Sequence, residues 1–272
     1  MSTLAAWLAG AATGDLLPWI AQQAAMARFG LSCAQVEEEA LSAGLLPARY
    51  QRNRRTISTA GQLKLLRSSV AVVGCGGLGG YAIEQLARLG VGRLVVIDPD
   101  RFEEHNLNRQ LLSSLAELGR AKVEAAASRV ASINPVVAVV PHRVALDAAN
   151  GAGLLAGVDV VIDGLDGIPA RLTLAAVCAS AGLPLVHGAI AGWYGHVATQ
   201  LPGDRTIEQL YGGATEPRGV EQELGNPAFT PAVIASLQVA EACKLLLGEG
   251  VLLRGRQLHV DLWSMEFVEI AG

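Results

Sequence analysis

The sequence VAVVGCGGLGG, residues 70–80, joins a short aliphatic run to a turn rich in glycine. The aliphatic run predicts a buried strand. LGGYAIEQLARLG, residues 78–90, predicts a helix because its apolar residues recur at helical spacing and it ends in glycine. A second aliphatic run, GRLVVID at residues 92–98, predicts the next strand. Strand, helix and strand in this order form a βαβ unit, which predicts a parallel sheet.

The glycines of this turn have the spacing of a phosphate-binding loop. Gly74, Gly76 and Gly79 follow the pattern G-x-G-x-x-G directly after a strand and open the helix. Such glycines allow a tight turn and a close approach of phosphate, and the helix N-terminus offers N–H donors. Asp98, near the end of the second strand, can accept hydrogen bonds from ribose hydroxyls. The motif predicts a nucleotide site but does not by itself distinguish ATP from NAD.

The rest of the chain repeats the alternation of strands and helices. The segment WYGHVATQL, residues 193–201, follows a strand too closely for a crossover helix, which predicts antiparallel pairing. We therefore expect an α/β fold with a Rossmann-like, mostly parallel sheet, helices on both faces and antiparallel strands in the C-terminal half. Further strands are predicted at residues 136–141, 158–164, 183–190, 251–255 and 257–264, and further helices at residues 119–135, 168–182 and 231–248.

The chain divides into an extension and one large domain. Residues 1–48 predict a helical N-terminal extension, in which Gly30 ends one helix and Ser32 with Gln35 forms a capping box for the next. We expect residues 49–272 to form the main domain. Within it, the connection from Pro202 to Pro231 is rich in glycine, proline and charge, which predicts a long irregular segment of the kind that often has a function.

Composition excludes several classes of function. Charged residues make up 17% of the chain and the formal net charge is −4, so we expect no surface for nucleic acid. Residues 172–203 carry no charged side chain, but Pro184 and several glycines and histidines interrupt them, so we expect no membrane span. The N-terminus lacks a basic segment, which argues against a secretory signal.

The cysteines point to a reducing compartment. Cys33, Cys75, Cys178 and Cys243 lie far apart and form no C-x-x-C pair, so the sequence indicates neither a zinc site nor a disulfide framework. We therefore expect a cytoplasmic protein.

A polar stretch decides which nucleotide is bound. DPDRFEEHNLNRQLL, residues 98–112, places Asn106, Arg109 and Gln110 just after the expected ribose carboxylate, and Lys122 opens the following helix. A dinucleotide oxidoreductase has no evident need for these residues, whereas two cations suit a triphosphate. Asp166, at the end of a later strand, is placed to hold Mg²⁺. Taken singly, these side chains could also be surface ions or a helix cap.

Together these segments resemble the MoeB/ThiF/HesA family, adenylating proteins related to the ubiquitin-activating enzymes. The resemblance runs from about Arg49 to the C-terminus. It implies an ATP-binding α/β domain of the ThiF type, usually a homodimer, that adenylates the C-terminal Gly-Gly carboxylate of a small ubiquitin-like sulfur carrier protein. The segments that carry it, in family order, are RYQRN, VVGCGGLGG, VVIDPD, NLNRQLL, GRAKVEAA, SINP, VVIDGLD, LPLVHGAIAGWYGHV and SLQVAEACKLLLG.

The resemblance implies a role for each candidate residue. Asp98 would bind the ribose, Asn106 and Arg109 the phosphates, and Lys122 the phosphates and the reacting centre. Asp166 would hold Mg²⁺. Arg52, which composition alone assigns to a solvated charge run, would reach the neighbouring subunit's site. We thus expect catalysis by Arg52, Arg109, Lys122 and Asp166, and nucleotide binding by Gly74, Gly76, Gly77, Gly79, Asp98, Asp100, Asn106, Arg109, Gln110 and Lys122.

The chain also departs from the family pattern. Many relatives carry two C-x-x-C pairs for structural zinc and this sequence has none, so we expect ATP and Mg²⁺ but no zinc. The connection from Pro202 to Pro231 has no cysteine where thioester- or persulfide-forming relatives place theirs, so we expect the reaction to stop at the adenylate. His187 and His196 are expected to satisfy hydrogen bonds in the core or in a groove.

Other functions stay open at this point. One is adenylation of a tRNA base or a peptide C-terminus. A second is a nucleotide-binding partner protein without catalysis, and a third is an NAD-dependent oxidoreductase. The residues Arg52, Asn106, Arg109, Lys122 and Asp166 argue against the last two. The sequence does not name the carrier protein, its pathway or the sulfur donor.

Overall fold

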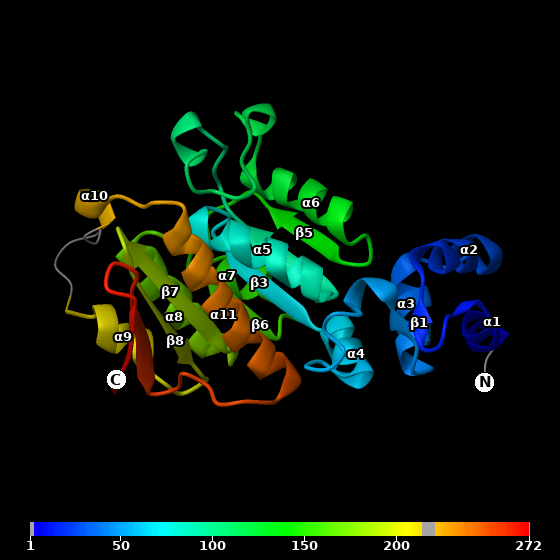
Figure 1. Cartoon of the computed structure of the whole chain (residues 1–272). Helices are drawn as coiled ribbons and strands as arrows, with labels where there is room; N and C mark the ends of the chain where they lie inside the picture. Colours follow the sequence, from blue (N-terminus) through cyan, green and yellow to red (C-terminus); the bar gives the residue numbers. More distant parts are fainter. Residues whose placement is uncertain (1–2, 214–220, 272) are drawn as a thin grey trace.

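A single eight-stranded sheet forms the centre of the computed structural model, which describes residues 3–213 and 221–271 (Figure 1). The strand order is β10-β9-β8-β7-β6-β3-β4-β5. Strands β7, β6, β3, β4 and β5 are parallel to one another. Strand β8 pairs antiparallel with β7, β9 with β8, and β10 with β9. This arrangement confirms the predicted fold class. The strands are β3 (Ser69–Val73), β4 (Arg93–Ile97), β5 (Ala138–His142), β6 (Val160–Asp163), β7 (Leu185–Ala191), β8 (Tyr194–Gln200), β9 (Arg256–Asp261) and β10 (Glu266–Ala271).

Helices cover both faces of this sheet. One face packs against α5, α6 and α11, and the other against α7, α8 and α9 (Figure 1). Strand residues alternate between two apolar cores: Val70 and Val72 of β3 point into the first, and Ala71 and Val73 into the second. The helices of the domain are α4 (Thr59–Arg67), α5 (Gly77–Leu89), α6 (Lys122–Ile133), α7 (Gly151–Leu154), α8 (Ile168–Ala181), α9 (Thr206–Tyr211), α10 (Glu221–Leu224) and α11 (Phe229–Leu247).

Two glycines fix the turn between β3 and α5. Gly74 has a φ of +91°, and a Cβ at this residue would lie 2.5 Å from the carbonyl oxygen of Gly164. A Cβ at Gly79 would lie 1.7 Å from the carbonyl oxygen of Gly74. The first glycine therefore allows the turn, and the second lets α5 pack directly against the end of β3.

A Gly79→Ala substitution is expected to lower the free energy of unfolding by about 3 kcal/mol, because the added methyl group must displace backbone. Gly153→Ala is the matched control, since a Cβ at Gly153 meets nothing within 4 Å. Urea unfolding of both variants measures the difference. Equal stability of the two variants would contradict the close packing of α5 against β3.

The N-terminal extension folds as a small helical unit beside the domain (Figure 1). Ser32 and Gln35 form the predicted capping box, and Gly30 ends the preceding helix in the left-handed conformation. The extension also contains a short parallel pair of strands that the sequence did not predict. Its elements are α1 (Thr3–Ala11), β1 (Leu16–Leu17), α2 (Trp19–Phe29), α3 (Cys33–Ser42) and β2 (Leu46–Pro47).

A buried polar cluster joins the extension to the domain. Glu37 of α3 is fully buried, accepts a hydrogen bond of 3.0 Å from the Tyr50 hydroxyl and forms an ion pair with Arg49. Asn134, at the end of α6, donates to the same hydroxyl at 2.8 Å. Burial raises the pKa of Glu37, although Arg49 opposes the shift. These contacts fix the chain immediately before Arg52.

The C-terminal end of the chain differs from the prediction. Residues 251–255 do not form the expected strand, because the Leu253 N–H donates to the Glu241 side chain and the Leu253 carbonyl accepts from Thr199. The second predicted strand, at residues 257–264, ends earlier, at Asp261. The chain then turns into β10, which the sequence did not predict. The antiparallel part of the sheet therefore ends in a hairpin of β9 and β10.

The connection from Pro202 to Pro231 is less irregular than predicted. It contains α9 and α10, and α11 begins within it at Phe229. Residues 214–220 of this connection lie outside the described part of the chain. Helix α9 packs against α8 and β8, so it contributes to the sheet's second covered face.

One helix of the described chain is long and apolar enough to cross a membrane. It is α11, and half of its most apolar window is buried inside the protein. Length and composition alone are weak grounds for a membrane span. The uncharged residues 172–203 are divided among α8, β7 and β8, as the sequence predicted.

Candidate functional site

A cavity of about 520 Å³ opens at the carboxyl ends of β3, β4 and β6. Strand ends at this edge are the usual ligand sites of open α/β sheets. The cavity brings together most of the predicted site residues from four separate stretches of sequence. The predicted residues that line it are Gly74, Gly76, Gly77, Asp98, Asp100, Arg109, Gln110, Lys122 and Asp166.

The glycine turn and Asp98 form one wall of this cavity. The Asp98 carboxylate is buried; one oxygen accepts from the Cys75 N–H at 2.7 Å and the other from the Asp100 N–H at 2.8 Å. These bonds tie the glycine turn to the loop after β4. Helix α5 begins at Gly77, so its first N–H groups, which have no partner within the helix, lie at the cavity.

Two cations also line this cavity. The Lys122 ammonium is nearly buried and lies 3.0 Å from a carboxylate oxygen of Asp100, which is mostly exposed. Arg109 is half-buried and donates to the Asn108 side chain at 2.9 Å and to the His105 carbonyl at 3.1 Å. Both cations keep further N–H donors for an anion in the cavity.

Two neighbouring amides differ in position. Asn106 is buried and does not line the cavity; its side-chain oxygen accepts from the Glu103 N–H at 3.0 Å and closes the turn that carries Arg109. Gln110 does line the cavity, and its Oε1 accepts no hydrogen bond from the described residues. Asn106 therefore does not line the cavity in this structure, and its contact with phosphate stays a prediction.

Asp166 extends into the cavity from the loop after β6 and is exposed. Within residues 3–213 and 221–271, no group of three or more histidine, cysteine, aspartate or glutamate side chains could hold a metal ion. A single carboxylate beside a phosphate site nonetheless fits Mg²⁺, which commonly takes one or two carboxylates together with substrate phosphates.

Arg52 does not reach the cavity of its own chain. It is exposed in the turn after Tyr50 and lines a surface depression with Gln51, Arg54 and Arg55. Gly79 also lies outside the cavity lining, where it serves the packing of α5. The predicted role of Arg52 thus requires a second subunit.

A second, mostly apolar cavity of about 300 Å³ adjoins the first; we call it the apolar groove. It runs over β7, β8, β9 and β10, and two residues, Arg171 and Ile190, line both cavities. The remaining residues that line the groove are Ile168, Ala189, Ala191, Tyr194, Gly195, His196, Tyr211, His259, Val260, Asp261, Glu266 and Val268.

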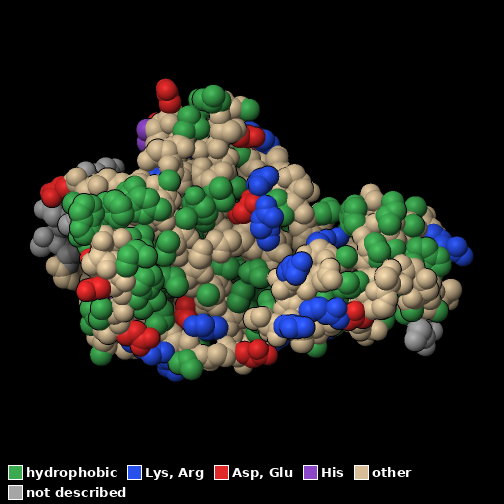
Figure 2. Space-filling view, viewed as in Figure 1, with side chains coloured by type: hydrophobic (Ala, Val, Ile, Leu, Met, Phe, Trp, Pro, Cys, Tyr) green, Lys and Arg blue, Asp and Glu red, His purple; other side chains and the backbone are tan. Residues whose placement is uncertain are grey.

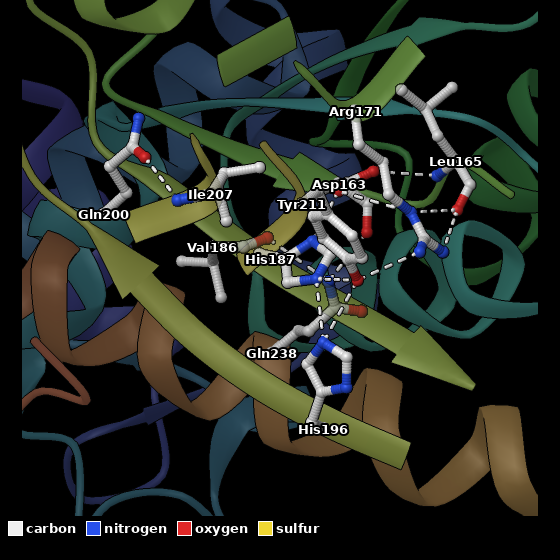
Figure 3. Close-up of polar contacts among 10 residues, drawn as sticks. All are labelled: Asp163, Leu165, Arg171, Val186, His187, His196, Gln200, Ile207, Tyr211 and Gln238. Carbon is white, nitrogen blue, oxygen red and sulfur yellow. Dashed lines mark hydrogen bonds and ion pairs between the residues drawn. The ribbon is translucent and has the colours of Figure 1, made fainter. Parts of the chain in front are cut away.

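A buried network of hydrogen bonds includes three residues that line the apolar groove, Arg171, His196 and Tyr211 (Figure 3). His187 donates through Nδ1 to Asp163 at 2.7 Å, and its Nε2 accepts from the Tyr211 hydroxyl at 3.0 Å. His196 Nε2 lies 3.2 Å from both of these partners, His187 Nε2 and the Tyr211 hydroxyl. Arg171 donates to the Tyr211 hydroxyl at 3.2 Å. We call these five residues the His187 network.

The family of the chain follows from a comparison with known sequences. The family model described as ThiF family matches residues 50–271, which is most of the chain. The chain belongs to the ThiF family. This membership confirms the resemblance drawn from the glycine turn and the segments that follow it.

Curated relatives of the ThiF family are similar over most of their length. The chain is 41% identical over 223 residues to the SAMP-activating enzyme E1 of Haloferax volcanii, covering 80% of this chain and 83% of the relative. It is 38% identical to the molybdopterin-synthase adenylyltransferase of Escherichia coli, covering 82% of this chain and 91% of the relative. It is 36% identical to the sulfur carrier protein adenylyltransferase of Thermus thermophilus, covering 80% of this chain and 84% of the relative.

Solved structures support the fold. A crystal structure of PaaA has a TM-score of 0.69 at 22% identity and covers 82% of each chain. A crystal structure of Escherichia coli MccB with ATP has a TM-score of 0.65 at 20% identity and covers 92% of this chain and 82% of that one. At such identities the likeness concerns the fold alone.

The sequence did not identify all residues of this ThiF-family site. Asp163 and Arg171 were not singled out, because an aspartate ending a strand and an arginine within a helix carry no motif. His187 and His196 were expected to satisfy hydrogen bonds in the core or a groove, and the structure confirms this. The role of Tyr211 could not be predicted from sequence, because its hydroxyl contacts His187 of β7 and His196 of β8 only once α9 has packed against the sheet.

Burial favours the neutral form of both histidines of the network. Burial lowers the pKa of His187 despite the neighbouring Asp163 carboxylate. Burial also lowers the pKa of His196, to about 3, and the positive charges that His187, His259 and Arg171 can carry act in the same direction. Neutral imidazoles leave Nε2 of His187 free to accept the Tyr211 hydroxyl.

The low pKa of His196 predicts acid sensitivity of the fold. The unfolded chain binds a proton at this histidine below its ordinary pKa of 6.5 and the folded chain does not, so stability falls as the pH falls from 6.5 towards 3. The free energy of unfolding falls by about 1.4 kcal/mol for each pH unit in this range. We expect His196→Gln to lose about 2 kcal/mol less than the native protein between about pH 6 and pH 4.5 in urea unfolding. Parallel losses in the two proteins would contradict a neutral His196.

Proposed function

We propose that this chain is an ATP- and Mg²⁺-dependent adenylyltransferase that activates the C-terminal Gly-Gly carboxylate of a small ubiquitin-like sulfur carrier protein. The observation that carries the proposal is a cavity with two cations, Arg109 and Lys122, that adjoins an apolar groove of about 300 Å³. The relatives support it, because their names describe an adenylyltransferase for a sulfur carrier protein, another for molybdopterin synthase and a SAMP-activating enzyme.

The chemistry needs cations rather than a base. A C-terminal carboxylate is already ionised at pH 7, so it attacks the α-phosphorus of ATP without losing a proton. A new O–P bond forms, the bond from the α-phosphorus to the bridging oxygen breaks, and pyrophosphate leaves with the electron pair. The obstacle is the approach of one anion to another, which Arg109 and Lys122 reduce from the cavity wall.

Asp166 is the residue that would hold Mg²⁺, and its exposed carboxylate at the end of β6 suits this role. The bound ion would screen the triphosphate and stabilise the leaving pyrophosphate. The Asp98 carboxylate keeps lone pairs for ribose hydroxyls beside its two backbone bonds.

The carrier would approach over the antiparallel end of the sheet. Exposed apolar side chains gather there, over α10, the start of α11 and the turn between β9 and β10 (Figure 2). Trp193 packs against Phe229 in a tilted arrangement and against Trp263 edge to face, with ring centroids 4.4 Å and 5.1 Å apart. The tail would then follow the apolar groove to Arg171 and Ile190, where the groove meets the nucleotide cavity. Glycines suit this passage because they add no side chain.

Arg52 would complete the site in a homodimer. Its exposed position outside its own cavity, in an arginine-rich turn anchored by Tyr50, supports a contact with the neighbouring subunit. There its guanidinium would stabilise charge on the transferring phosphoryl group.

The reaction would end at the acyl-adenylate. Burial raises the pKa of all four cysteine thiols, to about 12 for Cys178, to about 11 for Cys243 and well above the ordinary range for Cys75. None is therefore a thiolate ready to take the acyl group.

ATP–pyrophosphate exchange with Mg²⁺ and a panel of candidate Gly-Gly carriers tests the proposal. We expect exchange with one carrier and none when its terminal glycine is deleted. Binding of ATP without exchange for any carrier would favour a different substrate, such as a peptide C-terminus or a tRNA base, or a nucleotide-binding partner protein. Absence of ATP binding would overturn the assignment of the glycine turn.

A further inference from the structure

The loop that carries Asp166 is held from two sides by the His187 network. The Leu165 N–H donates to the Asp163 carboxylate at 2.9 Å, and the Leu165 carbonyl accepts two bonds from Arg171, at 2.8 Å and 3.2 Å. The N–H and the carbonyl group of Leu165 are thus both held by buried side chains. The position of the Asp166 carboxylate depends on these bonds.

The two side chains that hold this loop, Asp163 and Arg171, are both connected by hydrogen bonds to the Tyr211 hydroxyl. Asp163 is held by His187, and His187 Nε2 accepts from Tyr211. Arg171 donates directly to the same Tyr211 hydroxyl (Figure 3). Arg171 and Asp163 also pair directly, with Arg171 Nε 4.0 Å from a carboxylate oxygen of Asp163. Tyr211 is therefore a second point at which the two routes to the Asp166 loop meet, and the one that faces the apolar groove.

Tyr211 also faces the other cavity. It lines the apolar groove and is the last residue of α9. An occupant of the groove would contact its ring directly, whereas nucleotide in the first cavity would contact the Asp166 loop. The hydroxyl connects the two surfaces through buried groups that have little freedom to rearrange independently.

We infer that Tyr211 is a positioning residue that couples occupation of the apolar groove to the placement of the Asp166 carboxylate. The inference rests on the proposed function for the identity of the occupant, the Gly-Gly tail. A tail in the groove would fix the Tyr211 ring, and through His187 and Arg171 it would fix the loop that holds Mg²⁺. Binding of tail and of Mg²⁺–ATP would then strengthen each other by the same factor.

Two substitutions each remove the hydrogen bond between Tyr211 and His187 but keep the neighbouring groups in place. Tyr211→Phe removes the hydroxyl and keeps the ring in the groove. His187→Asn replaces Nδ1 by an amide nitrogen that can still donate to Asp163, and removes Nε2. Tyr81→Phe is the matched control, because Tyr81 lies on α5 and lines neither cavity.

Calorimetric ATP binding without a carrier, with Mg²⁺ and with EDTA, tests the placement of the loop. We expect Tyr211→Phe and His187→Asn each to weaken Mg²⁺–ATP binding about fivefold, with ATP binding in EDTA unchanged and the double variant no weaker than either single variant. Tyr81→Phe should match the native protein. Equal weakening with and without Mg²⁺ would indicate a general structural role, and native behaviour of both variants would overturn the inference.

The same titration at saturating carrier tests the coupling when ATP is replaced by its α,β-methylene analogue, which binds but cannot release pyrophosphate. In the native protein the carrier should strengthen binding of the Mg²⁺–analogue complex at least about fivefold, and both variants should lose this gain. An identical gain in native protein and variants, or no gain in the native protein, would overturn the coupling. Failure of every carrier to support exchange would refute the proposed function separately, while the carrier-free titration would still decide whether Tyr211 positions the loop.

Discussion

Replacement of Arg52 by alanine is expected to lower carrier-dependent ATP–pyrophosphate exchange about 1,000-fold, because the variant lacks a cation at the transferring phosphoryl group. ATP binding to the variant should be nearly unchanged, since Arg52 is expected to stabilise charge that develops only as the phosphoryl group is transferred. Initial exchange rates at saturating carrier give the ratio. Arg55→Ala, in the same surface depression, is the matched control for loss of positive charge.

Mixed dimers distinguish an action across the interface from an action within one subunit. A dimer of Arg52→Ala and Asp166→Asn chains would contain one complete site, built from Arg52 of one subunit and Asp166 of the other, and one site lacking both. Random mixing makes about half of all dimers mixed, so about a quarter of native activity should return. No recovery on mixing, although exchange of subunits is demonstrated, would contradict the trans role of Arg52.

Asp166→Asn is expected to lower exchange about 100-fold or more, because an amide is a weaker ligand for Mg²⁺ than a carboxylate and leaves the triphosphate less well screened. ATP binding in EDTA should be unaffected. Initial exchange rates over a range of Mg²⁺ concentrations measure the loss. Glu249→Gln, which removes an exposed carboxylate after α11, controls for the change in net charge.

A rate for Asp166→Asn within about threefold of native at all Mg²⁺ concentrations would contradict the assignment of the metal carboxylate. Asp100 would then be the next candidate, because it also lines the cavity and its carboxylate is mostly exposed.

The parallel half of the fold could be predicted because its signals are local. The aliphatic strands, the capping box at Ser32 and the glycine turn each depend on residues close together in sequence. Gly74 and Gly79 are required by backbone contacts that any chain with this turn must make. The antiparallel end of the sheet was harder to predict. Residues 251–255 are aliphatic like a strand, but Leu253 is bonded to the distant Glu241 and Thr199, so these residues do not form one.

The cavity could be predicted only in part for a similar reason. Asp98, Arg109 and Lys122 follow a motif and converge on one sheet edge, so sequence order places them together. Asn106 belongs to the same motif, but the fold uses its side chain to close a turn. The His187 network brings together α8, α9, β6, β7 and β8, and its contacts follow from the complete fold rather than from any spacing.

Intact-mass analysis of the carrier tests the central claim most directly. The native protein, incubated with ATP, Mg²⁺ and the carrier that supports exchange, should produce a carrier whose mass is increased by one adenylyl group on its C-terminal glycine. The Arg52→Ala protein should produce almost none under the same conditions. A carrier that stays unmodified, or an adenylyl group found on a residue other than the terminal glycine, would contradict acyl-adenylate formation by this chain.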